Sequence, residues 1–384
     1  MNTSRIPVWI CLLIGGLLST TARATIPADF DGDGDVDSAD LDLFEGCASS
    51  PGVPYATGCN GKDLDTDGDV DQADFGIFQL SWGSGVPMVL IPAGEFQMGD
   101  TFNEGYSAER PAHTVNLDAF FIDRAEVTNQ QYADALNWAK SQGNLITVGG
   151  GVVYKYNTSY PYCLTTPTYG ASRITWNGST FGVVAGKESR PMTVVSWYGS
   201  VAYANWRSGM QGKPLCYDLS TWSCNWNSGY RLPTEAEWEK AARGSTVGHR
   251  FPWSDTDTIQ HARANYYSST AYPYDNSPTR GYHPTFFTGG APFTSPVGYF
   301  AANGYGLYDM AGNVSEWCND WYSDTYYSSS PYDNPRGPTI ASYRVYRGGA
   351  WSTDAYICRV AFRGGNIPGS CGDTTGLRLV LDSP

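Results

Sequence analysis

The sequence predicts an α+β fold preceded by a small all-α module at the N-terminus. From Met88 onward, short apolar segments are separated by long loops rich in Gly, Pro, Asn, Ser and Tyr, and strands and helices do not alternate regularly. Ahead of this region, a tandem acidic repeat has the pattern of two loop–helix units. With 384 residues, of which 14% are aromatic and 16% charged, the chain has the composition of a globular protein with a substantial core.

Residues 1–24 are expected to form a cleaved signal peptide. Arg5 precedes an apolar run over residues 8–18, and Ala22-Arg23-Ala24 has the small-x-small pattern that signal peptidases cut. The run is too short for a stable transmembrane anchor. We therefore expect a secreted protein, extracellular or periplasmic, that is cleaved near Ala24 and has no transmembrane anchor; an uncleaved anchor is the alternative.

Export also determines how the cysteines are interpreted. Of the nine cysteines, Cys11 lies in the signal peptide, which leaves an even number in the mature chain. Exported proteins are oxidised in most cases, so the short separations favour local disulfides Cys47–Cys59 and Cys216–Cys224. Cys358 would then pair with one of the remaining thiols: Cys163, Cys318 or Cys371.

The acidity of the chain is local. The formal net charge is −14, and residues 25–84 contain fourteen Asp or Glu and one Lys, so the rest of the chain is close to neutral. No basic stripe is available to neutralise phosphates, and a nucleic-acid partner is therefore not expected.

Residues 25–80 contain two copies of an aspartate-rich loop, thirty-four residues apart. Both copies place carboxylates at loop positions 1, 3, 5, 7, 9 and 12 with glycine at position 6, the pattern of a helix-loop-helix calcium site. The predicted Ca²⁺ ligands are Asp29, Asp31, Asp33, Asp35, Asp37, Asp40, Asp63, Asp65, Asp67, Asp69, Asp71 and Asp74. A merely solvated acidic tract is the alternative.

With Asp at position 12 and a short helix after each loop, the repeats resemble dockerin-type, EF-hand-like calcium modules. The resemblance implies a calcium-folded domain that docks to a cohesin-like or cell-surface protein partner, in the manner of components of polysaccharide-degrading assemblies. A plain spacer or anchor is the competing interpretation. Residues 81–87 read as a linker, and a second domain is expected over residues 88–384.

Three helices are predicted in the large domain from their N-terminal capping residues. Thr128 with Gln131 and Thr234 with Glu237 have the spacing of capping boxes, and Ser196 is a further N-cap. The predicted helices cover residues 129–140, 197–207 and 235–243. Glu237 is accordingly expected to have a structural role and not that of a catalytic acid.

Seven separate segments of the large domain share one further pattern. They cover residues 91–99, 109–113, 126–132, 191–197, 231–244, 303–317 and 347–351, with Gly376-Leu377-Arg378 near the end. In this order they resemble the formylglycine-generating enzyme family, also called sulfatase-modifying factors. The resemblance implies a C-type-lectin-like fold, poor in regular secondary structure and held together by calcium and disulfides.

The founding activity of that family is oxidation of a sulfatase cysteine to formylglycine by O2 and a copper ion that two cysteines hold. Counting from the paired glycines, Cys358 falls on the first of these cysteines and Arg363 on the second. An arginine offers only donors, so copper is not an expected cofactor. Cys358 remains the candidate catalytic residue, but the resemblance favours a disulfide to Cys318, with Cys163–Cys371 as the remaining pair.

Calcium sites in the large domain are also implied by the resemblance. One would use the carboxylates of Asp309 and Glu316 with the carbonyls of Gly312 and Val314; the other would use Asn265 and the carbonyl of Tyr266. Surrounding aromatic residues could line a cleft for a peptide or glycan, although a core role is the favoured interpretation: Tyr266, Tyr267, Trp321, Tyr322, Tyr326, Tyr327 and Trp351.

These observations favour a secreted, calcium-binding member of the family that lacks the copper-dependent oxidase activity and acts as a binding or structural domain. An active oxidoreductase that converts a sulfatase cysteine to formylglycine is one alternative. A dockerin-mediated component of a polysaccharide-degrading or cell-surface assembly is the other.

Overall fold

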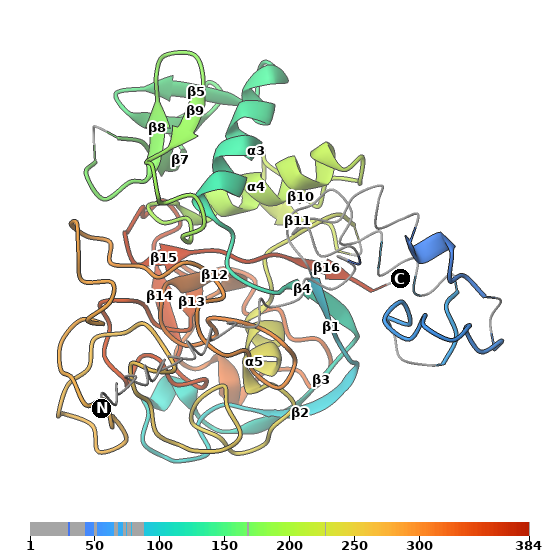
Figure 1. Cartoon of the computed structure of the whole chain (residues 1–384). Coiled ribbons are helices and arrows are strands. Elements are labelled where there is room, and N and C mark those ends of the chain that lie inside the picture. The colour runs from blue at the N-terminus through green and yellow to red at the C-terminus, as the bar shows by residue number, and fades with distance from the viewer. Residues whose placement is uncertain are drawn as a thin grey trace, which may run out of the picture. The chain divides into compact units, whose positions relative to one another are not determined.

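The structure is a computed structural model that describes residues 30, 43–49, 52–64, 68–71, 74, 78, 88–166, 169–226 and 228–383. The chain divides into two compact units, Met1–Gln79 and Leu80–Pro384. Figure 1 shows both units and the course of the chain.

The small unit is held by a disulfide and a cluster of aromatic rings. Cys47 and Cys59 form a disulfide, as predicted, with an S–S distance of 2.03 Å. Phe30, Phe44 and Phe78 stack on one another with ring centroids 5.2–6.3 Å apart. Within the described part of this unit, residues 43–45 are helical. Most of the predicted all-α module lies outside the described residues.

The three predicted helices of the large unit are confirmed. They are α3 (Asn129–Ser141), α4 (Trp197–Met210) and α5 (Glu235–Arg243). The Thr128 and Thr234 capping boxes are both formed, and the Ser196 side chain accepts a hydrogen bond from the N–H of Gly199. Capping therefore sets the start of each helix at the predicted residue.

Strands of the large unit are short and form several small sheets. A three-stranded antiparallel sheet has the order β1 (Met88–Ile91), β4 (Phe120–Asp123), β16 (Val380–Asp382). A four-stranded sheet has the order β14 (Gly364–Asn366), β13 (Arg344–Arg347), β12 (Ser315–Trp321), β15 (Thr375–Gly376), and only its β12–β15 pair is parallel.

The remaining strands pair locally. They are β2 (Gly94–Met98) with β3 (His113–Leu117); β5 (Ile146–Gly149), β6 (Val152–Lys155) and β7 (Pro161–Leu164); β8 (Ile174–Trp176) with β9 (Phe181–Val183); and β10 (Tyr217–Asp218) with β11 (Ser223–Cys224). Two 3-10 turns complete the set, η1 (Ser107–Glu109) and η2 (Tyr326–Ser328).

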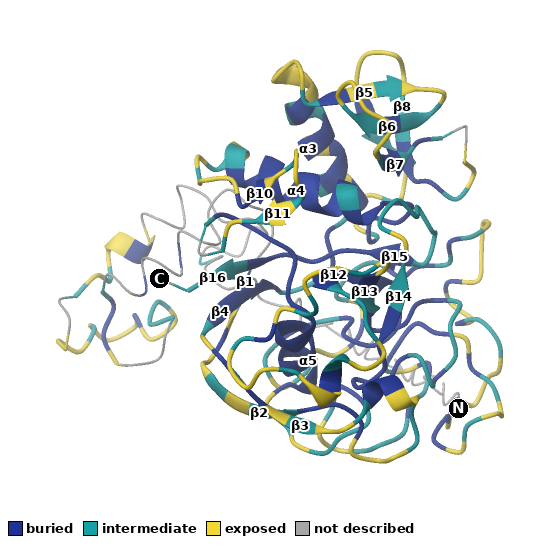
Figure 2. Cartoon of the chain, turned by 180° about the vertical axis from the view of Figure 1, so that it is seen from behind, coloured by how far each residue is buried: buried dark blue, intermediate teal, exposed yellow. Residues whose placement is uncertain are grey.

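Helix α5 lies at the centre of the large unit. It contacts β12 and β13 on one side and β2 and β3 on the other, and every residue in it is buried (Figure 2). Its Trp238 and Ala241 belong to the main hydrophobic cluster, which also includes residues of β2, β3, β4, β12 and β13. Helices α3 and α4 pack on each other and against the small strands β7 and β9 (Figure 1).

The predicted mixture of helices, short strands and long loops is confirmed in the large unit. Among the described residues, no helix combines the length and the apolar character that crossing a bilayer would require.

Candidate functional site

Cys358 lies in a turn after β13, and its thiol is enclosed. The side chain is 0% exposed and packs in a second hydrophobic cluster with Phe251, Tyr266 and Ala311. Gly349 covers the sulfur so closely that a Cβ at this position would lie 2.7 Å from it. Burial raises the pKa of the Cys358 thiol to about 12. The thiol is therefore protonated at neutral pH, whereas the thiolate is the form that attacks or binds metals.

Arg363, which the resemblance places at the second cysteine, makes a buried ion pair with α5. Its guanidinium donates to both carboxylate oxygens of Glu235, from Nε over 2.7 Å and from Nη2 over 2.6 Å. Nη1 donates to the carbonyls of Ala108 and Ser323. Although burial opposes the positive charge, Glu235 raises the pKa of Arg363, which is 2% exposed.

Two aromatic rings complete the enclosure of this guanidinium. It lies 4.3 Å from the ring centroid of Tyr327 and 4.9 Å from that of Tyr322. Every side of Arg363 thus has a partner, and the arginine holds η1, η2 and α5 together. This arrangement makes it a structural element of the core.

The residues at these two positions do not fit a copper site. Cu(I) prefers soft ligands such as thiolates, and here one thiol is available, protonated and enclosed. Arg363 has no lone pair to donate. The two side chains also have different neighbours. Gly349 and Thr353 lie next to Cys358. Arg363 is surrounded by Glu235, Tyr322 and Tyr327.

The predicted Cys318–Cys358 disulfide is wrong, because both residues are free thiols in separate hydrophobic clusters. Cys318 is on β12, among the residues that pack around α5, and Cys358 packs with Phe251 and Tyr266. The sequence proximity of Cys318 to the Glu316-Trp317 turn gave no information about this separation.

The other two predicted disulfides are not formed in the structure either. Cys216 and Cys224 are free, but Cys216 directly precedes β10, Cys224 is in β11, and their sulfur atoms are 3.1 Å apart. Cys163 and Cys371 are also free thiols, and burial, together with the charge of Cys371, raises the pKa of Cys163. Both pairings stay predictions for the oxidised protein.

The predicted calcium ligands Asp309, Gly312, Val314 and Glu316 lie in one segment that leads into β12. Both carboxylate oxygens of Glu316 accept hydrogen bonds from Arg378 over 2.7 Å, and one also accepts from the Trp238 indole. Asp309 Oδ2 accepts from the N–H of Gly298, while its Oδ1 is buried without a hydrogen-bond partner.

A calcium ion takes about six to eight oxygen ligands. In this segment Asp309 Oδ1 is a buried oxygen without a hydrogen-bond partner, whereas Arg378 donates to both oxygens of Glu316. Calcium binding by Asp309, Gly312, Val314 and Glu316 stays a prediction.

Glu126 belongs to this cluster and was not predicted as a site residue. It accepts hydrogen bonds from the Asn313 side chain and from the N–H of Val314. Burial raises the pKa of Glu126 well above its ordinary value, and the charges of Asp309 and Glu316 raise it further. The signal in the sequence was the Glu126-Val127-Thr128 segment, which contributed only to the family resemblance.

The polar groups of Asn265 and Tyr266 are used within the protein. The Asn265 amide donates to the carbonyl of Phe293, and its backbone carbonyl accepts from the N–H of Asn313. The carbonyl of Tyr266, the predicted calcium ligand, lies 3.1 Å from His261 Nε2. Asn265 and Asn313 therefore bring the two predicted calcium segments side by side, and calcium binding by Asn265 and Tyr266 stays a prediction.

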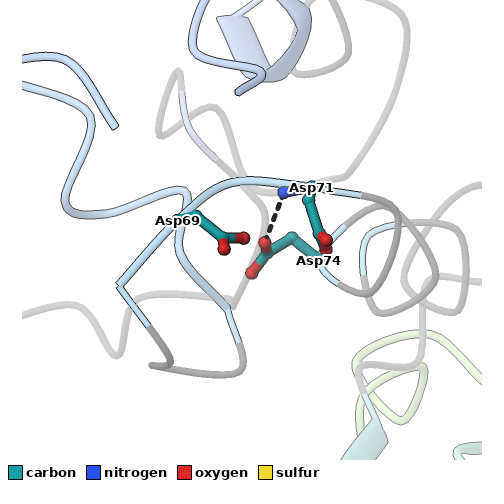
Figure 3. Close-up of side chains that lie close together, drawn as sticks. All are labelled: Asp69, Asp71 and Asp74. Carbon is teal, nitrogen blue, oxygen red and sulfur yellow. Dashed lines mark hydrogen bonds between the residues drawn. The ribbon is translucent and has the colours of Figure 1, made fainter. Parts of the chain in front are cut away.

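Four of the twelve predicted aspartate ligands of the small unit are described. The ligand oxygens of Asp69, Asp71 and Asp74 all lie within 4.8 Å of one another (Figure 3). Gly68 in the same loop has a positive φ of 102°, which suits the glycine at position 6. Asp63, at position 1, accepts a hydrogen bond from the N–H of Gly68. The donor set fits a hard cation in chemical terms, and calcium binding stays a prediction.

The other eight predicted ligands lie outside the described residues: Asp29, Asp31, Asp33, Asp35, Asp37, Asp40, Asp65 and Asp67.

The aromatic residues considered for a ligand cleft are divided between core and surface. Tyr266, Tyr327 and Trp351 are buried, as the favoured core interpretation predicts, whereas Tyr267 is 38% exposed.

Comparison with known proteins shows the family of the large unit. Residues 81–383 match the family described as the sulfatase-modifying factor enzyme 1-like domain. A formylglycine-generating enzyme of Streptomyces coelicolor is 34% identical over 315 residues, which cover 77% of this chain and 89% of that protein. The inactive C-alpha-formylglycine-generating enzyme 2 of Mus musculus is 29% identical over 320 residues, which cover 78% and 87%.

Among solved structures, Treponema denticola variable protein 1 superimposes with a TM-score of 0.53 and 27% identity, covering 78% of this chain and 95% of that one. The family match covers well over half of the sequence, and the capped helices and central α5 lie within it. The chain belongs to the sulfatase-modifying factor family, the family of the formylglycine-generating enzymes.

Proposed function

We propose that this chain is a secreted, calcium-stabilised member of the family that does not oxidise cysteine to formylglycine and acts as a binding domain. The observation that carries the proposal is the buried Arg363–Glu235 ion pair at the position of the second copper-binding cysteine. The copper-dependent reaction needs two thiolates at this place, and the chain supplies one enclosed thiol.

The chemistry of Arg363 strengthens the argument. Moving this guanidinium away to admit a metal would leave Glu235 without its main partner inside the protein, and an unpaired buried charge is strongly unfavourable. Cys358 could in principle react alone, but a thiol with a pKa of about 12 contains very little thiolate at neutral pH.

Inactivity also has a precedent among the relatives, because the matched Mus musculus protein is named as inactive. The Streptomyces coelicolor relative is named as a formylglycine-generating enzyme, so the family includes both kinds. Arg363 and its ion pair with Glu235 support the inactive alternative for this chain.

The small unit is proposed to bind Ca²⁺ through its paired loops and to attach the protein to a cohesin-like or cell-surface partner. The grouping of Asp69, Asp71 and Asp74 supports calcium binding. The Cys47–Cys59 disulfide supports export, since such bonds persist in oxidising compartments. A pull-down with the full mature chain tests the docking. We expect a partner protein to be retained in the presence of Ca²⁺ and released by a chelator.

Incubation with Cu(I), O2 and a cysteine-containing sulfatase peptide tests the loss of oxidase activity. Mass spectrometry of the peptide should show unchanged cysteine, both with the wild-type chain and with Cys358→Ala. The Streptomyces coelicolor enzyme serves as the positive control. Formylglycine formation that disappears in Cys358→Ala would show that the chain is an active oxidoreductase.

A further inference from the structure

Three basic side chains gather beside the hairpin of β8 and β9: Arg173, Lys187 and Arg190. Arg173 directly precedes β8, and the other two lie in the turns that follow β9. The N–H of Val184 donates to the carbonyl of Arg173 over 2.9 Å, and the N–H of Lys187 donates to that of Val184 over 3.0 Å. The hairpin, which is labelled in Figure 1, therefore brings cations from its two ends to one place.

The turn that carries Lys187 and Arg190 is anchored on helix α3. Asn129, the first residue of this helix, is 1% exposed. Its side-chain amide donates to the carbonyl of Lys187 over 2.9 Å and to that of Arg190 over 3.0 Å. These main-chain contacts fix the positions of both cations before any ligand arrives, which lowers the entropy lost on binding.

Arg173 is a buried cation whose charge has no counterion. The residue is 9% exposed, and its Nη2 donates to the carbonyls of Gly290 and Ala291 over 3.2 and 2.8 Å. Its Nε is buried without a hydrogen-bond partner. The carbonyls satisfy N–H groups but carry no charge that would balance the guanidinium.

This lack of a counterion is unusual among the buried arginines that the structure describes. Arg173 and Arg344 are the exceptions, and Arg344 lies between the rings of Trp197 and Trp321 at 3.7 and 3.6 Å from their centroids. The other buried arginines each pair with a carboxylate: Arg207, Arg231, Arg243, Arg347, Arg359, Arg363 and Arg378. Buried charges are paired as a rule, so the site of Arg173 is electrostatically incomplete.

The three cations repel one another. Burial lowers the pKa of Arg173, and the charge of Arg190 lowers it further. Burial also lowers the pKa of Lys187, and the charges of Arg190 and Arg173 add to this effect. Like charges that lie this close favour a bound anion.

The acidic side chains nearby leave the cations unpaired. Asp373 raises the pKa of Arg173 in part, but the two side chains form no ion pair. Glu188 is exposed and accepts a hydrogen bond from the N–H of Gly186. Within the described part of the chain, neither Lys187 nor Arg190 has an ion-pair partner. The cluster therefore has an excess of positive charge that reaches the surface through these two half-buried residues.

We propose that Lys187 and Arg190, with the buried charge of Arg173 beside them, bind one oxyanion group of an acidic ligand, an inference that rests on the proposed binding function. The group is a sulfate, phosphate or carboxylate, because a guanidinium offers a planar fork of N–H donors to two such oxygens and an ammonium adds a point charge. An acidic glycan and a free inorganic ion both present this chemistry. A nucleic acid or an anionic membrane would need a wide basic surface, whereas this cluster has three cations.

Calorimetric titration of the full mature chain tests the proposal. The probes are inorganic sulfate, a sulfated oligosaccharide and a uronic acid oligomer, with a neutral glucose oligomer for comparison. Ionic strength is held constant, because salt screens exposed charges. We expect at least one of the three acidic probes to bind and the neutral oligomer not to bind.

Matched variants separate the site from general charge effects. Arg190→Gln removes a charge-assisted contact and should weaken binding about tenfold, which corresponds to about 1.4 kcal/mol. Arg190→Lys keeps the charge and should retain more affinity than Arg190→Gln. Arg336→Gln is the control, because Arg336 is exposed, lies on the ring of Trp226 and has no ion pair among the described residues; it should leave binding unchanged.

Melting curves give a second readout. Arg190 has no ion pair to lose, so Arg190→Gln should fold. Added sulfate should raise its Tm less than it raises that of the wild-type chain. Sulfate stabilises folded proteins in general, so the difference between Arg190→Gln and Arg336→Gln decides the question. Lys187→Gln replaces Arg190→Gln if the latter does not fold.

Three outcomes would overturn the inference. They are the absence of binding to all three acidic probes at millimolar concentration, equal binding of the neutral oligomer, and unchanged affinity in both Arg190→Gln and Lys187→Gln. Tighter binding of the sulfated oligosaccharide than of inorganic sulfate would assign the oxyanion to a glycan, and equal binding would assign it to a free ion; both results support the site. Formylglycine formation, measured separately, would contradict the proposed function, whereas loss of anion binding would overturn this inference alone.

Discussion

Replacing Arg363 with alanine should destabilise the large unit far more than removing a surface ion pair. Arg363 and Glu235 are 2% and 1% exposed, and breaking a buried pair by removing one partner costs about 3–5 kcal/mol. Arg347 lies 3.5 Å from Glu235 and offers partial compensation, so we expect a loss near the lower end, about 3 kcal/mol. For a unit of about 300 residues, that corresponds to a fall in Tm of about 5 °C.

Denaturant unfolding followed by tryptophan fluorescence measures this loss. All of the 13 tryptophans except Trp9 and Trp82 lie beyond residue 88, so the signal reports on the large unit. The matched control is Arg263→Ala, which breaks the ion pair with Asp255. The side chain of Arg263 is 30% exposed and that of Asp255 is 61% exposed. Exposed pairs contribute about 0–1 kcal/mol. A loss for Arg363→Ala no larger than that of the control would refute the view that this arginine is a structural element of the core.

Three further predictions concern titration, cysteine pairing and calcium. Burial lowers the pKa of His261, so the unfolded chain binds a proton on this side chain more readily than the folded chain does. The free energy of unfolding should therefore decrease as the pH falls through about 6.5. Denaturation curves at several pH values should show that His261→Gln reduces this dependence. In the oxidised protein, non-reducing peptide mapping should find Cys216 bonded to Cys224. Replacing both cysteines with serine should lower the free energy of unfolding by about 2–3 kcal/mol. Alkylation of both thiols without reductant would contradict this pairing. Calcium titration of the full chain should show binding that Asp74→Ala weakens. The exposed control Asp324→Ala should leave the affinity unchanged. Equal affinities in the two variants would exclude the loop as the site.

The local parts of the fold could be predicted from sequence because their signals are local. The capping residues Thr128, Ser196 and Thr234 determine where three helices begin, and a contact three residues away is visible in the sequence. The short Cys47–Cys59 separation identified the disulfide of the small unit for the same reason.

Contacts between distant segments could not be predicted in this way. The partner of Arg363 is 128 residues away, and the partner of Glu316 is 62 residues away. Sequence reasoning therefore treated Glu316 as a free calcium ligand, although Arg378 holds both of its oxygens. It also paired Cys318 with Cys358, because their separation into two hydrophobic clusters is visible only in the three-dimensional structure.

The most direct test of the central claim is a Cu(I) titration in competition with a chelator, comparing the wild-type chain with Cys358→Ala. The close thiols Cys216 and Cys224 could themselves bind a soft ion, so both proteins carry serine at these positions. We predict identical curves, because Cys358 is enclosed and Arg363 cannot act as a ligand. One equivalent of tightly bound copper that is lost in Cys358→Ala would contradict the account.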